Sequence, residues 1–430
     1  MNNFINDYVV GVDVSSTSSV ITILKPDGEA YGKTFSITND LIGFNKLISI
    51  LNDINSKHSK KAKIFMESTG MYHLLLHNYF TNNNFECFII NPISTKNFAK
   101  QSIRKVKNDK IDSLRIAQLA QSPTFSIQNT FNENFFLLKK LCREYDSIID
   151  HRSHFKKKLN SLLNLVFPKF DKVFSDTFSP IPLAILSKYP TYNDFLATPK
   201  SDVIKLMKST INHSNEWAEK KYNLVLNIAL EAKSLKIPTS YLGSEVCCFI
   251  NIIESFSKTS DILKEQIYLL HKEMPNLEQN LKLLCTHPEV GFMSAVTLLA
   301  EIGDINNYKS AKKIVAFLGV DTSVSQSGNY NSTHNKLTKR GSRLARKTLY
   351  NLAIGSIKTR RNGAPANPIL LAYYKRLTKS KPKKIAICAI MHKLINHFFA
   401  ILRDQQPFEL RLPEIHEKNY LSKQLTLTAI

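Results

Sequence analysis

Two aspartates three residues apart, Asp109 and Asp112, lie in a strongly basic stretch of the chain, residues 100–115. If a helix begins near Asn108, this spacing places both carboxylates on one helix face, with Cβ atoms about 5–6 Å apart. A divalent cation between them would relieve their repulsion, and the surrounding Lys and Arg side chains suit a phosphate backbone. Acids framed by cations indicate a metal-dependent enzyme that acts on nucleic acid. The simpler interpretation is a helix start, with Asn108 as N-cap and the acids favoured by the helix dipole.

Two further acids, Asp13 and Glu67, occupy predicted strands. The apolar run Val9–Val14 reads as a buried strand that contains Asp13, and an acid there is costly unless it is paired or binds metal. Hydrophobic periodicity predicts strands and helices in the order β-β-β-α-β-α-β-α, at about 8–16, 18–25, 30–37, 41–51, 63–69, 70–82 and 85–90, with the last helix beginning near 108. This is the order of an RNase H-like fold, in which the first strand, the fourth strand and the last helix bring carboxylates together. We therefore expect Asp13, Glu67, Asp109 and Asp112 to converge on metal.

The remainder of the chain is predicted to be mainly helical. Two long amphipathic regions between about 131 and 275, the second broken near Ile237-Pro238, predict an antiparallel coiled-coil arm. From 282 the sequence reads helix, tight turn, helix, and the turn at 288–291 resembles a helix-hairpin-helix, whose backbone amides can hold a phosphate. A helix at about 309–318, a serine-rich loop and a basic helix at 336–347 follow. Taken alone, the serine-rich loop reads as a flexible linker.

Composition points to a polyanionic partner. The 430 residues favour two or three domains, and 43% hydrophobic residues suffice for sizeable cores. The formal net charge is +23, from 58 Lys and Arg against 35 Asp and Glu. A generally Lys-rich proteome would also raise this charge. Clustering argues against that as the full account, because residues 336–347 hold six basic residues and no acid.

Cysteine usage and hydropathy favour a cytoplasmic location. None of the six cysteines makes a C-x-x-C pair or stands at zinc-ligand spacing from a histidine, which indicates a reducing cytosol without a disulfide framework. The first residues lack the pattern of a signal peptide. No uninterrupted apolar run approaches the ~18 residues that span a bilayer, so we expect no membrane partner.

Three N-terminal motifs together resemble a known family. They are Val-Val-Gly-Val-Asp13-Val-Ser, Met-Glu67-Ser-Thr-Gly and Lys-Asn-Asp109-Lys-Ile-Asp112-Ser. They look like the acidic motifs of the DEDD transposases, the insertion-sequence one-ten family with its one-thousand-one-hundred-eleven branch. The C-terminal blocks His-Pro-Glu-Val-Gly, Leu-Leu-Ala-Glu-Ile-Gly-Asp, Gln-Ser327-Gly and Thr-Lys-Arg-Gly-Ser-Arg are also similar and follow in the family's order. Two departures are Glu289, where the family has the first hairpin glycine, and Asp321-Thr322 before the loop.

The resemblance implies an α/β plus all-α architecture. Its parts would be a RuvC-like, RNase H-like catalytic domain at 1–128, a helical coiled-coil arm at 129–277, a mainly helical transposase domain with the helix-hairpin-helix-like element at 278–405, and a tail at 406–430. The implied activity is DNA cleavage and strand exchange at an insertion sequence, guided by a bridge RNA that pairs with target and donor DNA. The implied partners are DNA, this RNA, and further copies of the chain joined through the arm as a dimer or tetramer.

The resemblance also implies the roles of individual residues. The four acids would bind one or two Mg²⁺ ions, with Mn²⁺ as a possible substitute, and a serine of the C-terminal domain would be the nucleophile. By its place in Gln-Ser-Gly that serine is Ser327, with Ser323 and Ser325 close enough to replace it if the alignment slips. Candidates for backbone contacts are Lys105, Lys107, Lys110, Lys339, Arg340, Arg343 and Arg346. Two alternatives stay open: a stand-alone metal-dependent Holliday-junction resolvase or nuclease, and an inactive nucleic-acid-binding relic.

Overall fold

The computed structural model describes residues 4–68, 70–99, 108–123, 125, 132–236, 239, 241–323, 326–327, 330–331, 336–410 and 414–415. Its contacts divide the chain into two compact units, Met1–Asn132 and Glu133–Ile430. The predicted backbone contacts Lys105 and Lys107 and the alternative nucleophile Ser325 lie outside the described residues.

The first unit is built on a mixed five-stranded sheet in the order β3-β2-β1-β4-β5. The strands are β1 Val9–Val14, β2 Ser18–Leu24, β3 Phe35–Thr38, β4 Lys63–Glu67 and β5 Cys87–Ile90. The first three pair antiparallel, whereas β1 pairs parallel with β4, and β4 with β5. The predicted meander and the alternation that follows it are confirmed. The third strand begins at Phe35, later than expected, after a turn at Gly32 with positive φ.

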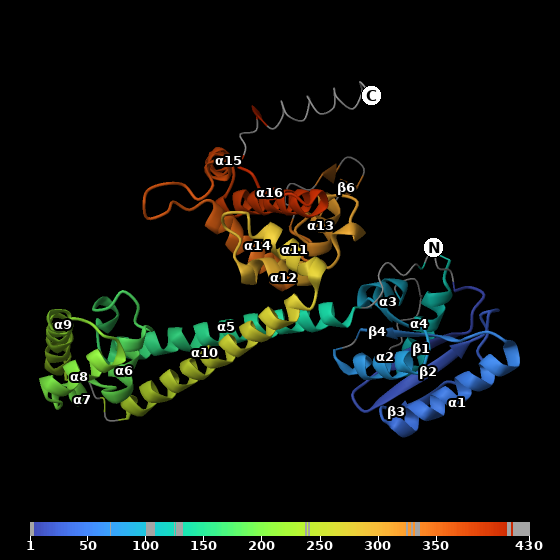
Figure 1. Cartoon of the computed structure of the whole chain (residues 1–430), viewed down its shortest axis with the longest axis horizontal. Coiled ribbons are helices and arrows are strands. Elements are labelled where there is room, and N and C mark those ends of the chain that lie inside the picture. The colour runs from blue at the N-terminus through green and yellow to red at the C-terminus, as the bar shows by residue number, and fades with distance from the viewer. Residues whose placement is uncertain are drawn as a thin grey trace. The chain divides into compact units, whose positions relative to one another are not determined.

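Helices cover both faces of this sheet (Figure 1). On one face, α1 (Leu41–His58) and α2 (Tyr72–Asn82) share a core with Val10 and Val12. Helix α1 begins as predicted, since the Asp40 carboxylate accepts a hydrogen bond from the Gly43 amide at 2.9 Å. On the other face lies α4 (Asp109–Gln121), with an additional short helix, α3 (Pro92–Ala99), that the sequence did not predict. Its first residue, Pro92, suits a helix start because it has no N–H to satisfy.

The second unit contains the predicted pair of long helices. Helices α5 (Glu133–Val166) and α10 (Leu242–Lys272) run antiparallel along their lengths (Figure 1), with ring centroids of His151 and Phe256 5.9 Å apart and those of Phe155 and Phe249 5.8 Å apart. At one end of the pair, shorter helices enclose a separate core that includes Phe167, Phe170 and Phe195. They are α6 Pro180–Lys188, α7 Tyr192–Leu196, α8 Lys200–Thr210 and α9 Asn215–Ser234.

Six helices form the C-terminal part of this unit. They are α11 Pro275–Leu284, α12 Phe292–Ile302, α13 Ala311–Leu318, α14 Arg343–Ser356, α15 Pro368–Thr378 and α16 Lys383–Asp404. Helix α16 is long and apolar enough to cross a membrane. Its residues Ile390, Leu394 and Phe398 are nevertheless buried in the core that the six helices share, as expected of a central core helix.

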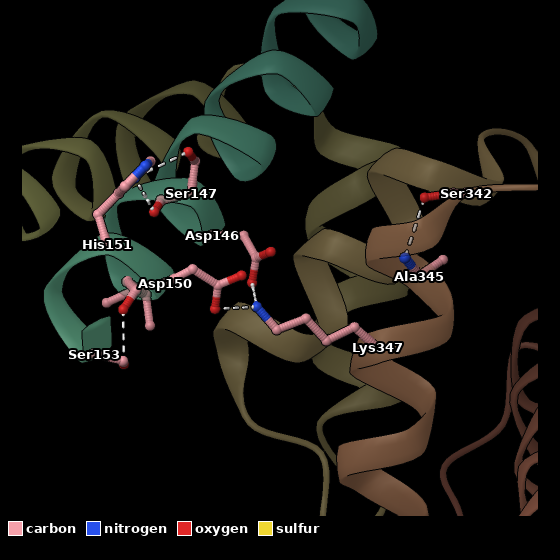
Figure 2. A network of polar contacts seen from close by, with 9 residues as sticks. Asp146, Ser147, Asp150, His151, Ser153, Ser342, Ala345 and Lys347 are labelled. Atoms are coloured by element: carbon pink, nitrogen blue, oxygen red, sulfur yellow. Dashed lines mark hydrogen bonds and ion pairs between the residues drawn. The ribbon is translucent and has the colours of Figure 1, made fainter. Parts of the chain in front are cut away.

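Charged side chains attach these helices to the start of α5. The buried Glu301 carboxylate of α12 receives two hydrogen bonds from the Arg143 guanidinium, at 2.7 and 3.1 Å, and an ion pair from Lys139 at 3.2 Å. Figure 2 shows Lys347 of α14 reaching Asp146 and Asp150 of α5, each at 2.7 Å. The start of α5 therefore belongs physically to the C-terminal helices.

The apolar core follows the same division. Leu138 and Cys142 of α5 are buried among the C-terminal helices, whereas Leu159 and Leu163 of the same helix belong to the core at the other end of the arm. The predicted boundaries at 128/129 and 277/278 stay predictions. The contacts of the structure place one division at 132/133.

Candidate active site

The register of the sheet places Asp13 beside Glu67. Strands β1 and β4 run parallel, and the last residues paired between them are Val12 and Met66. The next residue on each strand is an acid, Asp13 on β1 and Glu67 on β4. Neighbouring strands lie about 4.8 Å apart, so these two half-buried acids stand next to one another at the carboxyl ends of their strands.

Both acids belong to the sheet face that α4 covers. Val9 of β1 and Phe65 of β4 are buried in the core beneath α4. Successive side chains of a strand point to opposite faces, so every second residue shares a face. Asp13, four residues after Val9, and Glu67, two after Phe65, therefore point to the α4 side.

Helix α4 runs antiparallel to β1, which brings its first turn to the Asp13 end. Near the middle of the strand, the Ser113 hydroxyl lies 2.8 Å from the hydroxyl of Thr22, which is paired with Gly11. At the end of the helix, the Gln121 side-chain amide donates to the carbonyls of Asp7 and Lys25, at 3.2 and 2.8 Å, near the start of β1. The turn that carries Asp109 and Asp112 thus lies toward the edge where Asp13 and Glu67 stand.

The local contacts confirm the helix-start interpretation of the acid pair, whereas the metal interpretation stays a prediction. Asn108 is the N-cap, its side-chain oxygen accepting from the Lys110 amide at 3.1 Å, and both acids occupy the first turn of α4. The Asp112 carboxylate pairs with the Arg115 guanidinium at 3.0 Å, and the Thr95 hydroxyl donates to Glu67 Oε2 at 3.0 Å. Thr95 of α3 and Arg115 of α4 were missed in the sequence, because nothing in their spacing relates Thr95 to a strand some thirty residues earlier.

These contacts leave the metal centre a prediction. Within the part of the chain that the structure describes, no three His, Cys, Asp or Glu side chains gather closely enough to hold a metal ion. The elements that carry the four acids converge, while at least two of the carboxylates have protein partners. Carboxylate oxygens are the ligands that Mg²⁺ prefers, so the donor set fits this ion even though the observed side-chain positions do not enclose it.

The serine-rich segment is a hairpin where the structure describes it. Thr322 and Leu337 form an antiparallel bridge, and the Ser323 and Thr338 amides donate across the base to the Lys336 and Asp321 carbonyls, at 2.8 and 2.9 Å. Farther out, the strands β6 (Gln326–Ser327) and β7 (Tyr330–Asn331) pair with Ser327 opposite Tyr330. The linker interpretation is therefore wrong for the described residues, since the backbone hydrogen bonds of this loop are made across the hairpin.

Two glycines fix the base of the hairpin. Gly319 has φ +67°, and a Cβ atom there would lie 2.5 Å from the Arg340 nitrogen. A Cβ atom on Gly341 would lie 2.0 Å from the Phe317 carbonyl oxygen. Because residues 336–341 return along the hairpin, α14 begins only at Arg343, which corrects the predicted helix at 336–347.

The predicted backbone-binding residues differ in their surroundings. Lys110, Lys339, Arg340 and Arg343 are exposed. Arg346 instead donates to the carbonyls of Leu318 and Gly341, at 2.9 and 2.7 Å, and burial lowers the pKa of its guanidinium. Arg346 thus holds the base of the hairpin, which is a structural contact that the sequence did not predict.

The α11–α12 turn carries a carboxylate where phosphate binding was expected. The Glu289 carboxylate, 20% exposed, pairs with the Arg360 guanidinium at 3.5 Å. Gly291 is the N-cap of α12. The negative charge at this turn opposes a phosphate on its amides unless the Arg360 partner overcomes it.

Comparisons with known proteins match both ends of the chain. The transposase model for the DEDD domain of the IS110 family matches residues 10–168, and the model for transposases of the IS116/IS110/IS902 family matches residues 281–374. The pilin gene-inverting proteins of Moraxella bovis and Moraxella lacunata are each 30% identical over 163 residues, which is 38% of this chain and 49% of theirs. The chain thus spans about half the length of these curated relatives.

A search of solved structures gave a weaker likeness. The crystal structure of the Aquifex aeolicus member of the Ppx/GppA protein family covers 54% of this chain and 90% of its own, at 12% identity and a TM-score of 0.16. A TM-score this low does not indicate a shared fold.

Proposed function

We propose that this chain is an insertion-sequence transposase that cuts and rejoins DNA strands, because two transposase family models match residues 10–168 and 281–374. The observation that carries the proposal is the meeting of Asp13, Glu67 and the first turn of α4 at one edge of the sheet. Strand order β3-β2-β1-β4-β5 with α4 on the acid-bearing face supports an RNase H-like, RuvC-like domain.

In this proposal Asp13, Glu67, Asp109 and Asp112 hold one or two Mg²⁺ ions, or Mn²⁺ in their place. When bound, the ion supplies positive charge to the scissile phosphate. The chain supplies the rest of the arrangement: Thr95 orients Glu67 by its hydrogen bond, and Arg115 holds Asp112 until the carboxylate turns away from it. The exposed Lys110 beside the two aspartates would contact the DNA backbone, as would Lys105 and Lys107.

We assign Ser327 as the nucleophile. Its Oγ would form a bond to phosphorus while the bond from phosphorus to the leaving DNA oxygen breaks, and the hydroxyl proton is transferred to that leaving oxygen. The resulting phosphoserine ester keeps the bond energy for rejoining. Support comes from the hairpin, since the Ser323 hydroxyl already donates to the Lys336 carbonyl at 3.0 Å at its base, whereas Ser327 pairs with Tyr330 farther out. The exposed side chains of Lys339, Arg340 and Arg343 lie near the base of the hairpin and would contact the backbone of the DNA strand.

Guidance by a bridge RNA and assembly through the α5–α10 arm complete the proposal. The net charge of +23 supports binding of nucleic acid, whereas assembly of two or four copies rests on the family resemblance. The proposed location is the bacterial or archaeal cytoplasm, at the nucleoid.

The acids are tested by Asp13→Asn and Asp112→Asn, with Asp53→Asn in α1 as the matched control. Cleavage of a plasmid carrying the element with its native flanks should fall by about 10²-fold or more in the two variants and stay unchanged in the control. Titration calorimetry with Mn²⁺ gives a readout that is independent of activity, and binding should weaken in the same two variants. Unchanged cleavage and unchanged Mn²⁺ affinity in Asp13→Asn would refute the metal site.

Ser327 is tested separately. Ser327→Ala should abolish strand joining and the covalent protein–DNA species seen on denaturing gels, whereas Ser323→Ala should keep both. If the protein were a resolvase that uses water as the nucleophile, its Ser327→Ala variant would still cleave DNA. That result would exclude Ser327 as the nucleophile but would leave the roles of the four acids unchanged.

A further inference from the structure

The C-terminal helices contain a long acid-free segment. Between Asp321 and Asp404 the sequence has no Asp or Glu, yet residues 322–403 hold 17 Lys and Arg. A Lys-rich composition raises the number of cations in any protein, but it does not remove acids from 82 consecutive residues of one domain. The folded chain must either bring counter-charges to this segment or leave its cations to solvent and ligands.

Several of these cations are paired by groups from outside the segment. Lys347 meets Asp146 and Asp150 of α5, Arg360 meets Glu289, and Arg403 meets Asp404. Arg346 is held by two backbone carbonyls. Acids therefore reach these positions even though the segment itself contains none.

A second group of cations in the same segment has no acidic partner among the described residues. Six of them gather where α15 ends and α16 begins, and we name this group the basic corner: Lys375, Arg376, Lys379, Lys381, Lys383 and Lys384. All six are exposed, and within the described residues no acid forms an ion pair with any of them. Six like charges within ten residues repel one another, and the N-terminus of α16 adds further positive potential. This corner therefore attracts anions.

Tyr373 extends the positive surface along α16. The Arg376 guanidinium carbon and the Lys393 ammonium nitrogen lie 5.2 and 5.5 Å from the centroid of its ring, so one tyrosine holds cations from α15 and α16 together. Lys393 is itself exposed.

The same region of α16 contacts the serine hairpin. His392, next to Lys393, donates from Nε2 to the Val320 carbonyl at 3.0 Å, and Val320 begins the hairpin. Nine residues separate Lys383 from His392, which corresponds to about 14 Å along a helix axis. Phosphates of one duplex strand recur about every 3.4 Å along the axis, so this distance corresponds to about four phosphates, and one bound backbone can span it. Figure 1 shows α15 and β6 on either side of α16.

We propose that the basic corner together with Lys393 binds the phosphate backbone of a nucleic acid strand and leads it to the serine hairpin. The part played by the hairpin rests on the proposed function, whereas binding at the corner does not. The ligand chemistry is a phosphodiester backbone, which duplex DNA and structured RNA both offer.

Binding is tested with the full-length chain by fluorescence anisotropy, on a labelled DNA duplex and on a labelled RNA hairpin, over a series of salt concentrations. The variant is Lys379→Gln/Lys381→Gln/Lys383→Gln. The matched control removes three exposed helical lysines at the other end of the arm, Lys205→Gln/Lys220→Gln/Lys233→Gln. Because each phosphate contact contributes about 0.9 to the slope of log affinity against log salt for duplex DNA, the corner variant should lower that slope by about 2–3.

The outcomes separate the possible ligands. If the corner variant loses affinity only for the DNA duplex, the basic corner binds DNA. If it loses affinity only for the RNA hairpin, the corner binds RNA. An equal loss of affinity for both identifies a site for any phosphodiester backbone. If the control variant lowers affinity and slope as much as the corner variant, only net charge matters and the proposal fails. The measurement needs neither metal nor Ser327, so an inactive enzyme that still binds through the corner contradicts only the proposed function.

Discussion

A Cβ atom added to Gly11 would lie 2.2 Å from the carbonyl oxygen of Ser113, so α4 crosses β1 in direct backbone contact. This approach lets the first turn of α4 stand over the sheet edge that carries Asp13. Hydrogen bonds between the Ser113 and Thr22 hydroxyls and from Gln121 to the β1 and β2 ends fix the direction of the helix. The placement of two of the candidate acids therefore depends on a residue with no side chain.

Gly11→Ala should push α4 away from the sheet. Overpacking of this kind costs about 1–3 kcal/mol, because two backbone segments must separate. We expect a lower free energy of unfolding in urea and a loss of Mn²⁺ affinity. Gly355→Ala is the control, since a Cβ atom there meets only the Glu289 carboxylate, at 3.4 Å, and alanine favours the helix. Equal stability of the two variants would contradict the contact between α4 and β1.

Thr95→Val should weaken metal binding without unfolding the domain. The Thr95 hydroxyl donates to Glu67 at 3.0 Å, and groups that orient a metal ligand typically change affinity by about 10-fold or more. The expected result is a Mn²⁺ dissociation constant raised by about that factor in titration calorimetry. Thr95→Ser keeps the donor and should restore the wild-type value. A Thr95→Ser variant as weak as Thr95→Val would assign the effect to packing.

Glu301→Gln should loosen the C-terminal helices from α5. Burial by itself would raise the pKa of the Glu301 carboxyl, but the hydrogen bond from Arg143 and the charges of Lys139 and Arg143 outweigh it and lower the pKa. The stabilisation is therefore present above the ordinary value of 4.5 and is lost as the pH falls through the lowered pKa. We expect the free energy of unfolding of the variant to be lower than that of the wild type by up to about 3 kcal/mol at pH 7, and by less in strong acid.

Denaturant unfolding at pH 7 and pH 3 measures this difference. The control is Glu278→Gln, whose exposed pair with Lys282 at 2.8 Å should contribute little. A Glu301→Gln variant as stable as the Glu278→Gln control at pH 7 would show that the buried pair does not hold α12 to α5.

The protein should lose stability as the pH falls below 6.5, through His287. This side chain is fully buried beside Phe408, and burial, followed by the charge of His397, lowers its pKa from 6.5 to about 3. A depressed histidine pKa means that the unfolded chain takes up the proton first. The stabilisation is thus complete above pH 6.5, and each pH unit below that costs about 1.4 kcal/mol until the folded pKa is reached.

His287→Phe removes this titrating group. Unfolding free energies of the variant should fall less steeply between pH 6.5 and 5 than those of the wild type. His397, whose pKa burial lowers to about 4, lies 3.5 Å from His287 and is not an independent reference, so the wild type measured at the same pH values is the control. Identical slopes in the two proteins would mean that the pKa of His287 is the same in the folded and unfolded chains.

The first unit could be predicted from sequence because its signals are local. Alternating apolar residues and the Asp40 and Asn108 caps are read within a few positions of the elements they define. The direction of α4 was not readable, since it depends on Gln121 meeting the carbonyls of Asp7 and Lys25 about a hundred residues earlier. The partner Thr95 was missed because it meets Glu67 across 28 residues, whereas Arg115, three residues after Asp112, was within local reach and was overlooked.

The second unit shows the limits of composition. Serine, asparagine and glycine in residues 321–334 resemble a linker, yet the bridge between Thr322 and Leu337 makes the described part a hairpin. The basic helix predicted at 336 begins only at Arg343, because residues 336–339 pair back along the hairpin. Burial of Glu301 was not predicted either, since its cations come from α5.

The acid-free C-terminal stretch borrows its counter-charges from far up the chain. Asp146 and Asp150 precede Lys347 by 201 and 197 residues, and Arg143 precedes Glu301 by 158. A fragment that starts at residue 278 would leave Lys347 without acids, Glu301 without cations and a hole where Leu138 and Cys142 belong. The smallest piece that can be exchanged between related proteins is therefore discontinuous: the first half of α5 has to be inherited with the helices that it neutralises.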